Sequence, residues 1–175
     1  NRIVVVKPAI YSVYEMNILR SIESYLIDTE KNLVVYTAKN LNEVAKSLMM
    51  EIVEEKRADG VISINVKPDA GLIDAFNRHA LPLVMIDGGI MGGVNCINVD
   101  DFQSGYTAAE YLIKKGRRRI VVTAGDPRYG YTQDERIKGC RKAFYDYNVP
   151  EARFEILDLF LYSREDGLSA FTDVM

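Results

Sequence analysis

Two stretches of the sequence carry residue types that suit the binding of a small polar molecule. The segment "PAIYSVYE" (residues 8–15) gathers tyrosines, a serine and a glutamate, and "GDPRYGYTQDER" (residues 125–136) gathers tyrosines, aspartates and arginines. Aromatic surface combined with hydrogen-bonding groups is typical of sites for small polar ligands with apolar faces. We therefore predict ligand-binding residues in both stretches: Tyr14, Glu15, Tyr131, Thr132 and Arg136.

Two further candidates are single polar residues that follow short apolar runs. Asn65 comes directly after "GVISI" and Asp87 directly after "LVMI". Three of the candidates have a structural alternative. Asp87 before a glycine pair also fits an ordinary turn aspartate, Tyr14 also fits the first residue of a helix's core stripe, and Thr132 also fits a helix N-cap.

Arg136 is the sharpest candidate because of its place in a predicted helix. The apolar spacing predicts a helix over Thr132–Tyr147, with Arg136 in its first turn. The helix dipole disfavours a cation there. A cation in this unfavourable position indicates an anionic or hydroxyl-bearing binding partner. On the same grounds, removing Arg136 would leave the stability of the fold unchanged or slightly higher.

Residues for catalysis are sparse. The sequence contains no GxSxG, HExxH or GxxxxGK[ST] motif, and its one histidine and two cysteines offer little from which to build a nucleophile–base pair. Cys96 and Cys140 are predicted to be buried thiols, and His79 a solvated residue at a helix end. We predict no catalytic residue, no metal site and no cofactor.

The elements that must position the candidates alternate along the chain. Alternation of this kind predicts βαβ units with right-handed crossovers over parallel sheets, an α/β fold. Ligands of such sheets bind at the carboxyl ends of the strands, where the candidates fall. Strands are predicted at 2–6, 33–36, 60–64, 83–86, 96–99, 120–124 and 154–160, and helices at 14–30, 42–57, 70–79, 102–115, 132–147 and 164–175.

The alternation breaks once, at "GGIMGGVNCINVDD" (residues 88–101), where two strands follow each other with no helix between them. We predict two Rossmann-like subdomains, residues 1–99 and 100–175, with the second incomplete. The chain lacks an initiator methionine and reads as a piece of a longer protein. With 48% apolar and 27% charged residues and a net charge of −3, it fits a soluble globular protein without a basic surface for nucleic acid. It shows neither a signal peptide nor a stretch that would span a membrane.

The basic residues between Lys114 and Arg119 are predicted to mark a helix end. Lys114 and Lys115 fall in the last turn of a predicted helix, where cations are favourable. Gly116 supplies the left-handed residue that stops the helix. The arginines that follow lead into a strand at its amino end, opposite the edge predicted to bind ligand. A surface contact to a partner is the alternative.

The stretches "VDDFQSGYTAAEYLIKKGRRRI" (residues 99–120) and "ERIKGCRKAF" (residues 135–144) resemble the ligand-sensing core of LacI/GalR-type transcriptional regulators. The similarity is strongest over Ala58–Phe144 and continues colinearly from Ile3. Two departures are Asp101, where the family usually has asparagine, and Arg117, where it usually has histidine. Neither position is a usual effector contact.

The resemblance implies the periplasmic-binding-protein-like type I fold, with a small-molecule effector between two subdomains. It also implies a cytoplasmic homodimer that binds operator DNA through a helix-turn-helix headpiece, which nothing in this sequence matches. The effector would be a sugar or a nucleobase-like molecule, since the residues suit both. By the resemblance, Tyr14 and Glu15 match first-loop effector contacts, Asp87 a strand-end aspartate near the effector, and Thr132 and Arg136 contacts of the second subdomain.

Two other functions compete with this one. The first is a sugar-binding protein of a transport or receptor system with the same fold. The second is an enzyme, such as a phosphoacceptor at Asp87, which the lack of an acidic pair after the first predicted strand disfavours.

Overall fold

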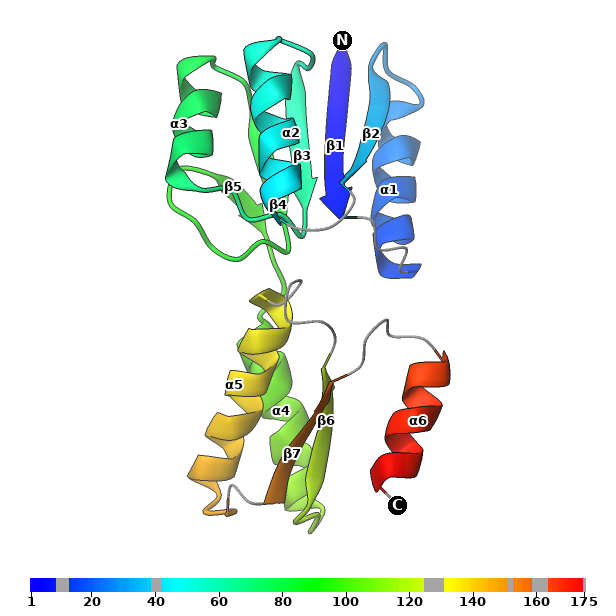
Figure 1. The fold of residues 1–175 in the computed structure, drawn as a ribbon, viewed down its shortest axis with the longest axis vertical. Coiled ribbons are helices and arrows are strands. Elements are labelled where there is room, and N and C mark those ends of the chain that lie inside the picture. Colours follow the sequence, from blue (N-terminus) through cyan, green and yellow to red (C-terminus); the bar gives the residue numbers. More distant parts are fainter. Residues whose placement is uncertain (9–12, 39–41, 125–130, 151–152, 159–163, 175) are drawn as a thin grey trace. The chain divides into compact units, whose positions relative to one another are not determined.

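The computed structural model of the chain describes residues 1–8, 13–38, 42–124, 131–150, 153–158 and 164–174 (Figure 1). Strands and helices alternate, and every strand pairing is parallel. The predicted α/β class with Rossmann-like parallel sheets is therefore confirmed. The chain divides into two compact units, Asn1–Asn98 (unit 1) and Val99–Met175 (unit 2).

Unit 1 is a five-stranded sheet in the order β2-β1-β3-β4-β5. The order places β1 between β2 and β3, so that the chain moves outward in both directions from it. The right-handed crossover rule then puts α1 on one face of the sheet and the helices α2 and α3 on the other. The strands are β1 (Arg2–Pro8), β2 (Asn32–Ala38), β3 (Gly60–Ile64), β4 (Leu83–Ile86) and β5 (Asn95–Ile97), and the helices are α1 (Val13–Leu26), α2 (Asn42–Glu54) and α3 (Ala70–Arg78).

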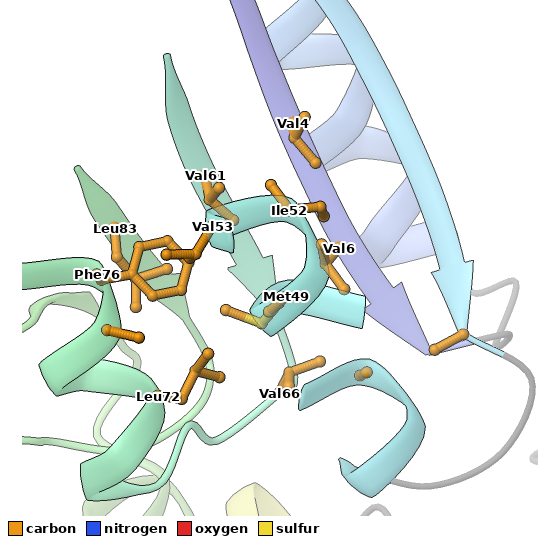
Figure 2. Close-up of a cluster of buried hydrophobic side chains, with 13 residues drawn as sticks. Val4, Val6, Met49, Ile52, Val53, Val61, Val66, Leu72, Phe76 and Leu83 are labelled. Carbon is orange, nitrogen blue, oxygen red and sulfur yellow. The ribbon is translucent and has the colours of Figure 1, made fainter. Parts of the chain in front are cut away.

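The core of unit 1 lies between the sheet and the pair of helices α2 and α3 (Figure 2). Val4 and Val6 of β1 meet Met49 and Ile52 of α2, and all four side chains are fully buried. The β-branched run "IVVV" suits this position because a central strand is buried on both faces. Val5, which alternates to the opposite face, is fully buried as well.

Helix α1 departs from the predicted packing. The apolar spacing of residues 14, 18, 22, 25 and 26 predicts one buried stripe, but only Leu26 of these is buried, whereas Tyr25 is 81% and Tyr14 is 50% exposed. The helix also ends at Leu26, earlier than predicted, because the hydroxyl and the N–H of Thr29 both donate to the Leu26 carbonyl and close the last turn. Tyr14 is therefore not a core residue, which leaves it available for another role.

Unit 2 contains a two-stranded sheet of β6 (Ile120–Ala124) and β7 (Phe154–Asp158), together with α4 (Asp101–Lys114), α5 (Tyr131–Asp146) and α6 (Arg164–Val174). Helices α4 and α5 pack against each other at a pair of glycines. A Cβ on Gly105 would lie 2.7 Å from the Arg136 carbonyl carbon, and one on Gly139 would lie 2.9 Å from the Phe102 carbonyl carbon. Only glycine permits so close an approach of two helix backbones.

The predicted helix end after Lys114 is confirmed. Gly116 has a φ of +80°, and its N–H and that of Arg117 donate to the Ile113 and Leu112 carbonyls. This is the left-handed termination that favours glycine. Arg119 then pairs with Glu155 at 3.2 Å, with both side chains about half exposed. His79, likewise as predicted, is exposed at the C-terminal end of α3.

The arginines of this segment lie at the amino end of β6, and we expect them to contribute little. Replacing Arg117, Arg118 and Arg119 together with glutamine should change the free energy of unfolding by no more than about 1 kcal/mol, because exposed ion pairs are worth little. Affinity for the effector should stay within about threefold of the wild type. Urea unfolding and calorimetry check both. A tenfold loss of affinity would mean that the cluster belongs to the binding site.

Candidate functional site

Three elements of unit 1 bring polar side chains to the carboxyl edge of its sheet. Tyr14 stands in the first turn of α1, Asn65 directly follows β3, and Asp87 directly follows β4. The hydroxyl of Tyr14 donates to Oδ2 of Asp87 at 2.5 Å. The residues are distant in sequence, so this contact exists only because β1, β3 and β4 are parallel and end at the same edge.

Asn65 and Asp87 share an unusual backbone conformation. Their φ angles are +54° and +57°, in the left-handed region that asparagine and aspartate tolerate better than other side chains do. Each is held by the neighbouring strand: Asn65 N–H donates to the Ile86 carbonyl at 2.9 Å, and Asp87 N–H to the Ile97 carbonyl at 3.0 Å. Strained conformations at strand ends are common at binding sites.

Glu15 lies deeper than its neighbour Tyr14. Its side chain is 1% exposed and pairs with the equally buried Lys7 of β1, with 3.0 Å between Lys7 Nζ and Glu15 Oε2. Lys7 Nζ also donates to the Pro8 carbonyl at 2.7 Å. The amide of Asn65 donates from Nδ2 to Glu15 Oε1 at 3.4 Å. The structure thus joins Glu15 with Asn65, and Tyr14 with Asp87.

In unit 2, Arg136 has a partner within the chain. Its Nε donates to Oδ1 of Asp101 at 2.7 Å, and the Asp101 side chain is 5% exposed while that of Arg136 is 57% exposed. Arg136 does not lie in the first turn of its helix, as was predicted, because α5 begins at Tyr131 and Arg136 falls in the second turn, where the helix dipole has little effect on a cation. Asp101 in turn occupies the first turn of α4, where a carboxylate is favoured.

Among the described residues, the guanidinium of Arg136 is therefore held from one side only. The bond to Asp101 uses Nε, which leaves the two terminal nitrogens without a partner among the described residues, on a side chain that is 57% exposed. A planar guanidinium with free terminal N–H groups is suited to grip hydroxyls or a carboxylate in two places. Asp101 orients the group without neutralising its capacity to donate.

The remaining two candidates lie at the start of α5. Thr132 is half-buried and is the second residue of the helix, so the alternative that it is the N-cap is wrong. The helix starts one residue earlier than the apolar spacing predicted. Tyr131 is the first helical residue, and its side chain lies outside the described part of the structure.

Lys7 and Asp101 are the site residues that the sequence did not point to. A signal for Lys7 exists, since a lysine inside the run "IVVVKP" interrupts a strand that is otherwise apolar. The sequence marked Asp101 only as a departure from the asparagine usual in the family that it resembles. Its contact with Arg136 joins two helices and cannot be read from local spacing.

The described residues were also compared with what a reactive cysteine, a metal site and a membrane span would require. Burial raises the pKa of the Cys140 thiol, which is typical of a structural cysteine, and Cys96 is half-buried. Among the residues described, no three histidine, cysteine, aspartate or glutamate side chains gather closely enough to hold a metal ion. Within the same residues, no helix combines the length and the apolar character needed to cross a membrane.

Comparison with known proteins places these features in a family. Residues 3–174 match the family described as "Periplasmic binding proteins and sugar binding domain of LacI family". The regulator MalR of Streptococcus pneumoniae is 25% identical over 133 residues, which are 76% of this chain and 40% of that protein. The chain thus spans about 40% of the length of this curated relative.

Solved structures agree on the fold. A LacI family regulator from Enterococcus faecium with bound ribose superposes with a TM-score of 0.80 at 19% identity, over 99% of this chain and 63% of that one. A periplasmic solute-binding protein of an ABC transporter from Actinobacillus succinogenes with bound D-allose has a TM-score of 0.71 at 19% identity, with the same coverage of both chains. Both regulators and transport proteins therefore share this architecture.

Proposed function

Because the chain belongs to the family of periplasmic binding proteins and sugar-binding domains of LacI-type regulators, we propose that it is the effector-binding domain of a DNA-binding transcriptional regulator. A small molecule would bind to it and shift the protein between two states of different operator affinity. Such a shift requires that the ligand bind one state more tightly than the other. No chemical step is involved, and we propose a binding protein rather than an enzyme.

The observation that carries this proposal is the polar cluster at the carboxyl edge of unit 1. A tyrosine that donates to a nearly buried aspartate, beside an asparagine with a strained backbone, is an arrangement suited to a ligand with several hydroxyls. Arg136, held by Asp101, is the proposed contribution of unit 2, together with Thr132 and Tyr131.

The charges favour a neutral polyhydroxylated ligand such as a sugar. Glu15 is compensated by Lys7 and Asp101 by Arg136, so two of the three acidic groups among these residues already have a cationic partner. A nucleobase-like ligand is the second candidate, favoured by the half-exposed ring of Tyr14 as a stacking surface. The sugars bound to the two structural relatives give ribose and allose as first probes.

A solute-binding protein of a transport system is the alternative function, since the fold serves both roles. The regulator MalR among the curated relatives supports the regulatory role. We propose that the whole protein is a cytoplasmic homodimer that contacts operator DNA through a separate headpiece. The sequence of the complete gene distinguishes the two: a helix-turn-helix upstream supports the regulator, and an export signal supports the transport protein.

The test of ligand binding is calorimetry of the full-length protein with D-ribose, D-allose and adenine. We expect at least one of these to bind, and Tyr14→Phe to weaken that binding by about fivefold, because it removes one hydrogen bond worth about 1 kcal/mol. Tyr25→Phe is the matched control, since Tyr25 is exposed on the same helix, and it should leave the affinity unchanged. Equal effects of the two variants would remove Tyr14 from the site.

A further inference from the structure

Lys7 occupies a position where strand chemistry alone would favour an apolar residue. It follows three fully buried valines in β1, and by alternation its side chain shares a face of the sheet with Val5, the face that α1 covers. Its own side chain is 2% exposed. An apolar pair of similar size would stabilise such a position at least as well as a buried ion pair, because both charges must be desolvated. Stability therefore does not explain the pair.

The pair is in contact with the side-chain amide of Asn65. Lys7 stands 3.0 Å from one oxygen of Glu15, and the other oxygen accepts from Asn65 Nδ2 at 3.4 Å. Lys7 and Glu15 form an ion pair, in which Glu15 is a carboxylate. An ionised carboxylate only accepts hydrogen bonds, so Asn65 must turn its NH2 group toward it. Within the described part of the chain, the carbonyl oxygen of the Asn65 amide is then the atom left to meet a ligand.

Without the ammonium of Lys7, the side chains of Glu15 and Asn65 could form their hydrogen bond in a second way. A buried, protonated Glu15 carries an O–H group, which would donate to the carbonyl oxygen of Asn65 in the flipped orientation of the amide. Asn65 would then present donors in place of an acceptor. The orientation of one amide thus decides whether a ligand hydroxyl meets an acceptor at this point.

We propose that Lys7 is a positioning residue for ligand binding: through the ionised Glu15 it orients Asn65 so that the amide oxygen accepts a ligand hydroxyl. Lys7 is too deeply buried to touch the ligand itself. The inference rests on the proposed function, because it takes Asn65 to be a ligand contact. It adds a residue that sets which hydrogen-bonding partner the site prefers.

The first arm of the test needs no ligand. In full-length protein labelled with ¹⁵N-asparagine, the side-chain NH2 resonance of Asn65 is assigned by its loss in Asn65→Gly, where glycine keeps the left-handed backbone. We expect Lys7→Met to shift this resonance. The matched control is Val61→Ala, which weakens the buried core on β3 without touching the network. An unmoved resonance in Lys7→Met, or an equal shift in Val61→Ala, overturns the proposal.

The second arm measures coupling by calorimetry with the tightest binder among D-ribose, D-allose and adenine. Asn65→Gly and Lys7→Met should each weaken binding by about tenfold or more, and Asn65→Gly made on top of Lys7→Met should cost less than about threefold further. Independent losses that multiply would indicate a merely structural role and overturn the proposal. An unchanged affinity in Lys7→Met would do the same.

The experiment remains decisive if Lys7→Met does not fold or if no probe binds. Should Lys7→Met fail to fold, Lys7→Met combined with Glu15→Gln removes both charges and takes its place in both arms. Should no probe bind the wild type, the proposed function in its present form fails, while the resonance of Asn65 still decides whether Lys7 orients it.

Discussion

Replacing Gly105 with alanine is expected to destabilise unit 2 by about 3 kcal/mol or more, at the upper end of what overpacking costs in proteins. The added Cβ would press on the carbonyl group of Arg136 in the facing helix, which is backbone and cannot rotate away. Helices α4 and α5 would have to separate, and the contact between Asp101 and Arg136 would weaken with them. Urea unfolding of the full-length protein measures the loss.

The matched control is Gly167→Ala, also at a helical glycine. A Cβ on Gly167, in α6, would meet nothing within 4 Å, so this variant should be neutral or gain about 0.5 to 1 kcal/mol from the better helix propensity of alanine. Equal stability of Gly105→Ala and Gly167→Ala would mean that the two helices do not pack as closely as described.

Arg136→Ala is expected to weaken effector binding by about 2 to 4 kcal/mol, because it removes a charge-assisted hydrogen bond donor from the site. The fold should also suffer, by about 1 to 3 kcal/mol, since the buried Asp101 carboxylate loses its partner. This corrects the expectation from helix position alone, which predicted no loss. Calorimetry and urea unfolding of the same variant separate the two effects.

Two companion variants sharpen that result. Lys138→Ala removes an exposed cation from the same helix, and we expect it to change both quantities by less than about 0.5 kcal/mol. Asp101→Asn keeps an acceptor for Arg136 Nε and should retain most of the affinity. Unchanged binding in Arg136→Ala would exclude Arg136 from the site. A large loss of stability with normal affinity would make it a structural residue.

The alternation of short apolar runs with amphipathic stretches was sufficient to predict the order of the elements. β1 and β3 could be predicted because each contains a run of apolar, mostly β-branched residues, which is typical of strands buried on both faces. The end of α4 could be predicted because a single residue, the left-handed Gly116, terminates the helix. Where no such residue marks a boundary, the predicted boundary differs from the observed one, as at the end of α1 (Leu26) and at the start of α5 (Tyr131).

The contacts of the candidate site could not be predicted in the same way. The bond from Arg136 to Asp101 depends on two helices packing through Gly105 and Gly139, and nothing in local spacing announces that packing. Tyr14 fitted the helical stripe by period, yet it is half exposed because α1 covers the sheet with few of its residues. Burial and partners are set by tertiary packing, which periodicity does not encode.

The burial of Glu15 could not be predicted from the sequence either. Its type and position suggested a direct ligand contact, but the structure buries it against Lys7. The lysine was overlooked because a single charge in a strand has no periodic signature. Only the parallel pairing of β1 with β3 and the start of α1 brings Lys7, Glu15 and Asn65 together.

The most direct test of the central claim is the operator affinity of the full-length protein with and without a saturating sugar that it binds. Fluorescence anisotropy with labelled DNA from upstream of its own gene provides the measurement. If this chain is the effector-binding domain of a regulator, the sugar should change the operator affinity by about 5-fold to 150-fold, the usual range of allosteric coupling. Arg136→Ala should abolish that response at the same sugar concentration. Identical operator affinity with and without the bound sugar would contradict the account.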